Sequence, residues 1–83
     1  MSKFALLTDF IDFLESELLL SKGEVHATAE IRSLRTWGSL NALIVISRIN
    51  DETSILLTAG DLAACKTVAD LHQLIVSRSN GTY

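Results

Sequence analysis

The chain has 83 residues, of which 48% are hydrophobic, with four glycines and no proline. A chain of this length buries only roughly 60% of its unfolded surface, so residues 1–83 form one domain with a small core. Ten acidic and seven basic residues give a formal net charge of -3. The basic residues are scattered, whereas nucleic-acid phosphates require a concentrated basic face, so we expect no nucleic-acid partner.

Cysteine and histidine usage excludes several kinds of site. Cys65 is the only cysteine, which rules out an intrachain disulfide and a thiolate zinc cluster. His26 and His72 have no partner at a metal-binding spacing, so no metal site is expected. Cys65 follows Leu62-Ala63-Ala64, a context typical of a small buried residue in a helix rather than of a reactive thiol.

The hydropathy pattern argues against targeting or membrane segments. The apolar run that begins at Phe4 is interrupted by Asp9 and Asp12 before it reaches the length of a signal peptide. No run approaches the ~20 apolar residues that a membrane span needs. We therefore expect a monomeric cytoplasmic protein with no membrane partner.

The periodicity of the first segment predicts a helix over residues 3–19. Acidic side chains occupy its other faces, and Lys22-Gly23 supplies a stop because glycine takes the left-handed conformation without steric cost. Apolar residues recur at steps of three and four, and two phenylalanines widen the stripe: Phe4, Leu7, Ile11, Leu14 and Leu18, with Phe10 and Phe13. The acidic residues are Asp9, Asp12, Glu15 and Glu17.

Residues 24–37 lack a regular period and are predicted to form a long ordered loop. Connections of this length in small domains are usually functional or held by their own apolar side chains. A short helix over residues 27–34 is the alternative. The side chains that can hold the loop are Val25, Ile31, Leu34 and Trp37.

Three more helices are expected, over residues 39–51, 59–65 and 68–77, followed by a frayed tail at 78–83. Thr58 with Asp61, and Thr67 with Asp70, have the spacing of short capping boxes. Ser39 stands at the start of its helix, where its hydroxyl either caps the helix or is held out in solvent.

The order of these elements and the residues at their starts resemble the acyl carrier protein family. Over Trp37 to Ile75, roughly half of the chain, the match to that family's pattern has no gaps. Gly60-Asp61-Leu62 with Cys65-Lys66-Thr67-Val68 is similar to the free-standing carriers of specialised biosynthetic clusters. The matching residues are Gly38-Ser39-Leu40, then Leu43, Val45, Ile46 and Ile49, then Leu57, then Thr67-Val68-Ala69-Asp70-Leu71.

The resemblance implies an all-α four-helix bundle of the acyl-carrier type, in which Ser39 carries a 4′-phosphopantetheine arm taken from coenzyme A by a phosphopantetheinyl transferase. The thiol of the arm would hold an acyl group as a thioester and present it to acyl-loading and acyl-transferring enzymes of fatty acid or polyketide biosynthesis. The N-terminus of the helix would favour the phosphodiester. No histidine or acid is placed by sequence to activate Ser39, so the protein is not expected to be an enzyme.

The resemblance also implies where cargo and partners bind. Short acyl chains in carriers lie between the helices, so a cavity is expected beside the residues Leu43, Ile46, Leu62, Leu71 and Ile75. Partner enzymes are expected at the second helix, through Leu40, Asn41, Ile44 and Arg48. Leu40, Leu43 and Ile46 can fill an inward stripe, which leaves Ile44 or Val45 toward solvent. Ile44 is then either buried in a wider stripe or exposed as a partner contact.

Two departures from the family pattern leave alternatives open. Gly38 replaces the family's aspartate, which serves recognition and metal binding by the transferase, so modification of Ser39 is efficient, impaired or lost. The early part of the second helix lacks the acids that steer basic partners. The alternatives to an acyl carrier are an unmodified carrier-like interaction module and a peptidyl or aminoacyl carrier.

Overall fold

The computed structural model describes residues 4–81, and for residues 79–81 it describes the backbone alone. The fold is all-α, with four helices, a long connection after the first helix and a short third helix, as predicted. The elements in order are α1 (Leu7–Glu17), the 3₁₀ turn η1 (Ile31–Ser33), α2 (Ser39–Thr53), α3 (Ala59–Ala64) and α4 (Val68–Gly81). An isolated bridge between Glu30 and Thr67 is the sole β pairing of these residues.

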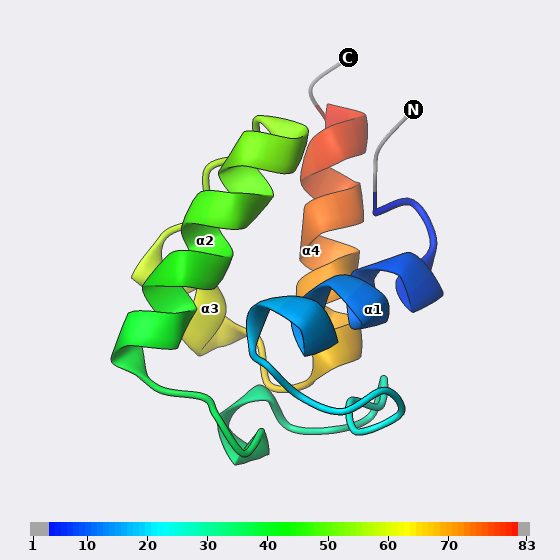
Figure 1. Ribbon diagram of the computed structural model, residues 1–83. Coiled ribbons are helices and arrows are strands. Elements are labelled where there is room, and N and C mark those ends of the chain that lie inside the picture. Colours follow the sequence, from blue (N-terminus) through cyan, green and yellow to red (C-terminus); the bar gives the residue numbers. More distant parts are fainter. Residues whose placement is uncertain (1–3, 82–83) are drawn as a thin grey trace.

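The helices surround one apolar core (Figure 1). Helix α1 contacts both α4 and α2, α3 contacts α2, and the long loop runs along one end of the bundle. The buried apolar side chains come from all parts of this arrangement. The fully buried ones include Phe4, Phe10, Leu14, Val45, Ile49, Leu57, Val68, Leu71 and Ile75.

Helix α1 is shorter at both ends than the predicted 3–19. Leu6 is extended, with φ −96° and ψ 136°, so the helix begins at Leu7. It ends at Glu17 because Leu19 adopts a left-handed φ of 56°. The N–H of Leu20 then donates to the carbonyl of Glu15 at 2.8 Å. This is a Schellman motif with leucine, rather than glycine, at the left-handed position.

The buried stripe of α1 is centred on Phe10 and Leu14, and the predicted positions Leu7 and Ile11 are only half-buried. Phe4 lies edge-on to Phe10, with ring centroids 5.5 Å apart. The Nε2 of His72 on α4 lies 2.7 Å from the carbonyl oxygen of Phe4 and donates to it. The segment before α1 is thereby fixed to the last helix.

The long loop is ordered, as predicted, and one 3₁₀ turn takes the place of the alternative helix over 27–34. Its backbone bonds directly to the start of α4. The N–H of Ile31 donates to Lys66, and the N–H groups of Val68 and Ala69 donate to the carbonyls of Ala29 and Ala27, at 2.9–3.0 Å. The predicted apolar anchors are buried or partly buried: Val25, Ile31, Leu34 and Trp37.

Glu15 was predicted on an outer face of the first helix, and the structure shows instead that it is buried, with 5% of its surface exposed. Its Oε2 accepts from the N–H of Gly23 at 2.8 Å and from the N–H of Val25 at 3.0 Å. A buried carboxylate is tolerated here because it satisfies two backbone donors of the loop.

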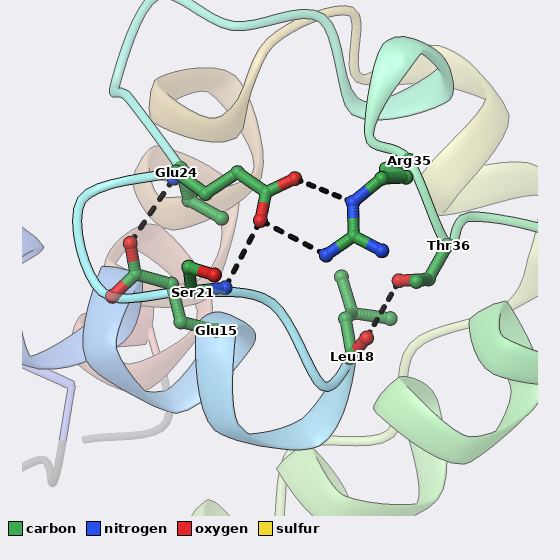
Figure 2. A network of polar contacts seen from close by, with 7 residues as sticks. Glu15, Leu18, Ser21, Glu24, Arg35 and Thr36 are labelled. Atoms are coloured by element: carbon green, nitrogen blue, oxygen red, sulfur yellow. Dashed lines mark hydrogen bonds and ion pairs between the residues drawn. The ribbon is translucent and has the colours of Figure 1, made fainter.

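Two further contacts of the same network hold the far part of the loop (Figure 2). The carboxylate of Glu24 accepts from the backbone N–H of Ser21 and from both Nε and Nη2 of Arg35. The hydroxyl of Thr36 donates to the carbonyl of Leu18 at 2.7 Å. The loop therefore returns to the end of α1 before it enters α2.

In the C-terminal half the predicted capping residues are confirmed, but the predicted ends of the helices are wrong by one to four residues. Thr58 and Asp61 form a capping box at α3, and Thr67 and Asp70 exchange the equivalent bonds at α4. Helix α2 continues past the predicted residue 51 to Thr53, α3 ends at Ala64 rather than 65, and α4 continues past 77 to Gly81. Residues 78–81 of the predicted frayed tail are thus helical, and residues 82–83 lie outside the described part.

Removing the Glu15 carboxylate is expected to destabilise the protein through the loop. Glu15→Ala leaves the N–H groups of Gly23 and Val25 without an acceptor and should lower the free energy of unfolding by about 1–3 kcal/mol. Glu15→Gln keeps a carbonyl acceptor and should cost less. Urea unfolding followed by circular dichroism measures both, and equal stability of the alanine variant and the wild type would contradict this role.

Stability is expected to fall in acid because several carboxylates are ionised more readily in the fold than in the unfolded chain. Hydrogen bonds from Arg35, and then from Ser21, lower the pKa of Glu24 to about 2. Arg78 lowers the pKa of Asp61, and the N–H groups of Thr67 and Lys66 lower that of Asp70. Since these folded-state pKa values lie below the unfolded ones, the stabilisation is present above about pH 4.5 and is lost as pH falls toward 2.

Thermal melting at pH 6, 4, 3 and 2 tests the contribution of Glu24 to this loss of stability in acid. Glu24→Gln should melt lower than the wild type at pH 6 and show a flatter decline below pH 4. Glu30→Gln, which changes an exposed carboxylate outside this network, should keep the wild-type profile. Identical profiles for wild type and Glu24→Gln would exclude the Glu24–Arg35 pair as a source of acid sensitivity.

Candidate functional site

Ser39 is the first residue of α2 and is exposed. The residue in the N-cap position is Gly38, and no side chain caps the helix. The hydroxyl of Ser39 makes no hydrogen bond to any residue in the described range 4–81. Of the two states left open by the sequence, the structure excludes capping by Ser39, because Gly38 is the N-cap and Ser39 is an exposed residue.

Ser39 lies at the edge of an open apolar groove of about 490 Å³. One wall is the side of α2 that carries Ser39, Leu43 and Ile46, the second is α3, and the third is the end of the long loop. We call this feature the α2–α3 groove. The residues that line it are Ile31, Arg32, Trp37, Gly38, Ser39, Ala42, Leu43, Ile46, Ala59, Leu62, Ala63 and Cys65.

Only part of the expected cavity lining is found in this groove. Leu43, Ile46 and Leu62 line it, as expected. Leu71 and Ile75 do not, because both are fully buried in the closed core beneath α4. The groove is therefore a surface feature between α2, α3 and the loop, and it does not reach the core residues Leu71 and Ile75.

The inward stripe expected for the second helix is correct at Ile46, which is buried, and wrong at Leu40 and Leu43, which are 71% and 60% exposed. Of the two residues expected toward solvent, Ile44 is 39% exposed and Val45 is fully buried, as is Ile49. Ile49 follows Val45 by four positions and Ile46 by three, so the buried residues share a face. Residues 40–46 are almost continuously apolar, and periodicity alone could not choose between the two faces.

The four residues expected to contact partners have different surroundings. Leu40 and Ile44, with Leu43, form an exposed apolar face next to Ser39. Asn41 is half-buried, and its amide nitrogen donates to the carbonyl of Thr36. Arg48 pairs with Glu17 of α1, with Nε 3.2 Å from Oε1. Asn41 and Arg48 thus also have structural contacts that connect α2 to the loop and to α1.

Gly38 has an extended backbone, with φ −172° and ψ 176°, which any residue adopts. A Cβ added at this position would meet no atom within 4 Å. Neither the backbone nor the available space therefore requires glycine where the carrier family has aspartate. The first turn of α2 also contains no acidic residue.

Sequence reasoning missed the contribution of Cys65, Trp37 and Arg32 to the groove. Cys65 is only half-buried and lies at the C-cap of α3 rather than inside a helix. Burial raises the pKa of its thiol, and nearby Asp70 and Asp61 add to this effect, so the thiol stays protonated near neutral pH. The proximity of Trp37 to Ser39 in sequence was the one available signal.

Neither a metal centre nor a membrane span is found in residues 4–81. That part of the chain holds no group of three or more His, Cys, Asp or Glu side chains suited to a metal ion, and none of its helices is long and apolar enough to cross a bilayer. Comparisons of the chain with protein-family models, curated proteins and solved structures gave no significant match.

Proposed function

We propose that this protein is an acyl carrier whose Ser39 hydroxyl receives a 4′-phosphopantetheine arm. The observation that carries the proposal is the position of Ser39. It is an exposed residue whose hydroxyl has no hydrogen-bond partner among residues 4–81, it is the first residue of α2, and it lines an apolar groove. The resemblance of residues 37–75 to carrier proteins supplies the identity of the modification.

The local electrostatics support this assignment. A phosphodiester on Ser39 would stand at the N-terminus of a 15-residue helix, where unpaired N–H groups and the helix dipole favour negative charge. The absence of an acid in the first turn removes a source of repulsion. Ser39 itself needs no activating base within this chain, because the transferase would supply it.

The modification is a phosphoryl transfer between the pyrophosphate of coenzyme A and the serine. The Ser39 oxygen forms a new bond to the phosphorus next to pantetheine. The bond between this phosphorus and the bridging oxygen of the pyrophosphate breaks, and adenosine 3′,5′-bisphosphate leaves. The hydroxyl proton passes to the transferase. The thiol at the free end of the arm then carries cargo as a thioester.

The groove supports an acyl cargo over a polar aminoacyl cargo. Most of its lining residues are apolar, and it begins beside the attachment point. An alkyl chain that leaves water in such a groove gains roughly 0.8 kcal/mol for each buried methylene. A peptidyl or aminoacyl carrier has less to gain from these walls.

A second candidate function, an unmodified interaction module, is favoured by two observations. Gly38 removes the carboxylate that the family presents to its transferase, and α2 presents an exposed apolar face at Leu40, Leu43 and Ile44. Such a face is typical of a protein contact. Loading of Ser39 separates this candidate from the carrier.

Incubation with coenzyme A and a broad-specificity transferase, followed by intact-protein mass spectrometry, tests the carrier proposal. The wild type should gain one phosphopantetheine group and Ser39→Ala none. Ser47→Ala changes another exposed serine of α2 and should load like the wild type. An adduct on Ser39→Ala would refute the attachment site, and an unloaded wild type would favour the interaction module.

The missing carboxylate is tested by Gly38→Asp. If the transferase uses an acid at this turn, the variant should load faster than the wild type in a time course of the same assay. Its fold should be preserved, and aspartate at the N-cap should raise stability by about a few tenths of a kcal/mol, measured by thermal melting. Equal loading rates would show that the replacement has no effect on transferase recognition.

A further inference from the structure

The α2–α3 groove has one charged residue among otherwise uncharged walls. Arg32 belongs to η1 and is exposed at the groove. It forms no ion pair with another residue of the part of the chain that the structure describes. The other two walls offer the apolar side chains of Leu43 and Ile46 from α2 and of Leu62 from α3. The groove thus combines an apolar channel with an available cation.

The positive charge of this groove is opposite in sign to the net charge of the chain, which is -3. A hollow of the same volume, about 490 Å³, lies between α1 and α2 and has the opposite character. Its charged side chains are four acids and one paired arginine: Asp9, Asp12, Glu17, Glu52 and Arg48. An anion is therefore repelled by that hollow and attracted by Arg32.

We propose that the α2–α3 groove binds, without a covalent bond, a free single-chain amphiphile with an anionic headgroup, such as a medium-chain alkyl carboxylate. The alkyl chain lies against Leu43, Ile46 and Leu62, and the headgroup pairs with the guanidinium of Arg32. The volume of the groove falls within the range of small-molecule sites in proteins. This binding does not depend on modification of Ser39 and goes beyond the carrier function.

Trp37 provides a direct measurement because it is the only tryptophan of the chain and lines the groove. Decanoate titrated into the unmodified protein, below its micelle concentration, should change Trp37 emission saturably. Affinity should rise from octanoate to dodecanoate by up to about fourfold per methylene, until the groove is filled. Decylamine, with the same chain and a cationic head, should bind more weakly.

The headgroup contact is tested by Arg32→Gln and Arg32→Glu, both at an exposed position where folding should be unaffected. Arg32→Gln should weaken decanoate binding by about two- to fivefold, the range of an exposed ion pair. Arg32→Glu should reverse the preference, so that decylamine binds more tightly than decanoate. Arg48→Gln, which changes an arginine outside this groove, should bind like the wild type.

The chain contact is tested by a matched pair on α2. Leu43→Gln changes a groove wall and should weaken binding by about three- to tenfold, whereas Leu40→Gln changes a more exposed leucine that does not line the groove and should have no effect. Amide chemical-shift changes on adding decanoate should centre on Ile31, Ala42 and Leu62.

The proposal is overturned if no saturable Trp37 response occurs, if Arg32→Gln binds like the wild type, or if the shifts lie between α1 and α2. The failure of this proposal is separate from that of the carrier function, because decanoate binding is measured on the unmodified protein: a wild type that cannot be loaded can still bind decanoate, and one that loads can still fail to bind it.

Discussion

The structure depends most on the buried carboxylate of Glu15. One oxygen of this side chain accepts from two backbone N–H groups of the long loop, and so fixes the start of that loop against α1. The far part is held by Glu24 with Arg35 and by Thr36 with Leu18. The 21 residues between the end of α1 at Glu17 and the start of α2 at Ser39, which contain only one 3₁₀ turn, would otherwise carry a large entropic cost and many unsatisfied polar groups.

The candidate site is a consequence of this arrangement. The loop supplies one wall of the α2–α3 groove through Ile31, Arg32 and Trp37, and its last residues set where α2 begins and hence where Ser39 stands. The bonds from the loop to the start of α4 add a second attachment. The exposed Ser39 is thus positioned by contacts in which its own side chain takes no part.

Much of this fold was predictable from the sequence, because local chemistry dictates it. The capping boxes at Thr58 and Thr67 set two helix starts, and the apolar anchors of the loop were recognisable from their isolation among polar residues. The position of Ser39 at the head of its helix was equally local.

Three features were beyond prediction because they depend on distant contacts. Burial of Glu15 requires the loop donors to return to α1. The face of α2 was ambiguous because residues 40–46 are nearly all apolar, and the burial of Val45 rather than Leu43 is decided by packing. The end of α1 was predicted at residue 19 but lies at Glu17, because Leu19 takes a left-handed conformation. That conformation is expected of glycine and not of leucine.

The hydrogen bond between His72 and the carbonyl of Phe4 joins residues that are 68 positions apart. It therefore closes a loop that contains most of the chain. The entropy lost in closing a ring increases with its length, and nothing is gained from it until α4 has formed and presents the imidazole. We therefore expect the segment before α1 to dock, during folding, after the local helices and the loop are in place. Its detachment would expose the Phe4 ring while leaving the α2–α3 groove at the other side of the core intact.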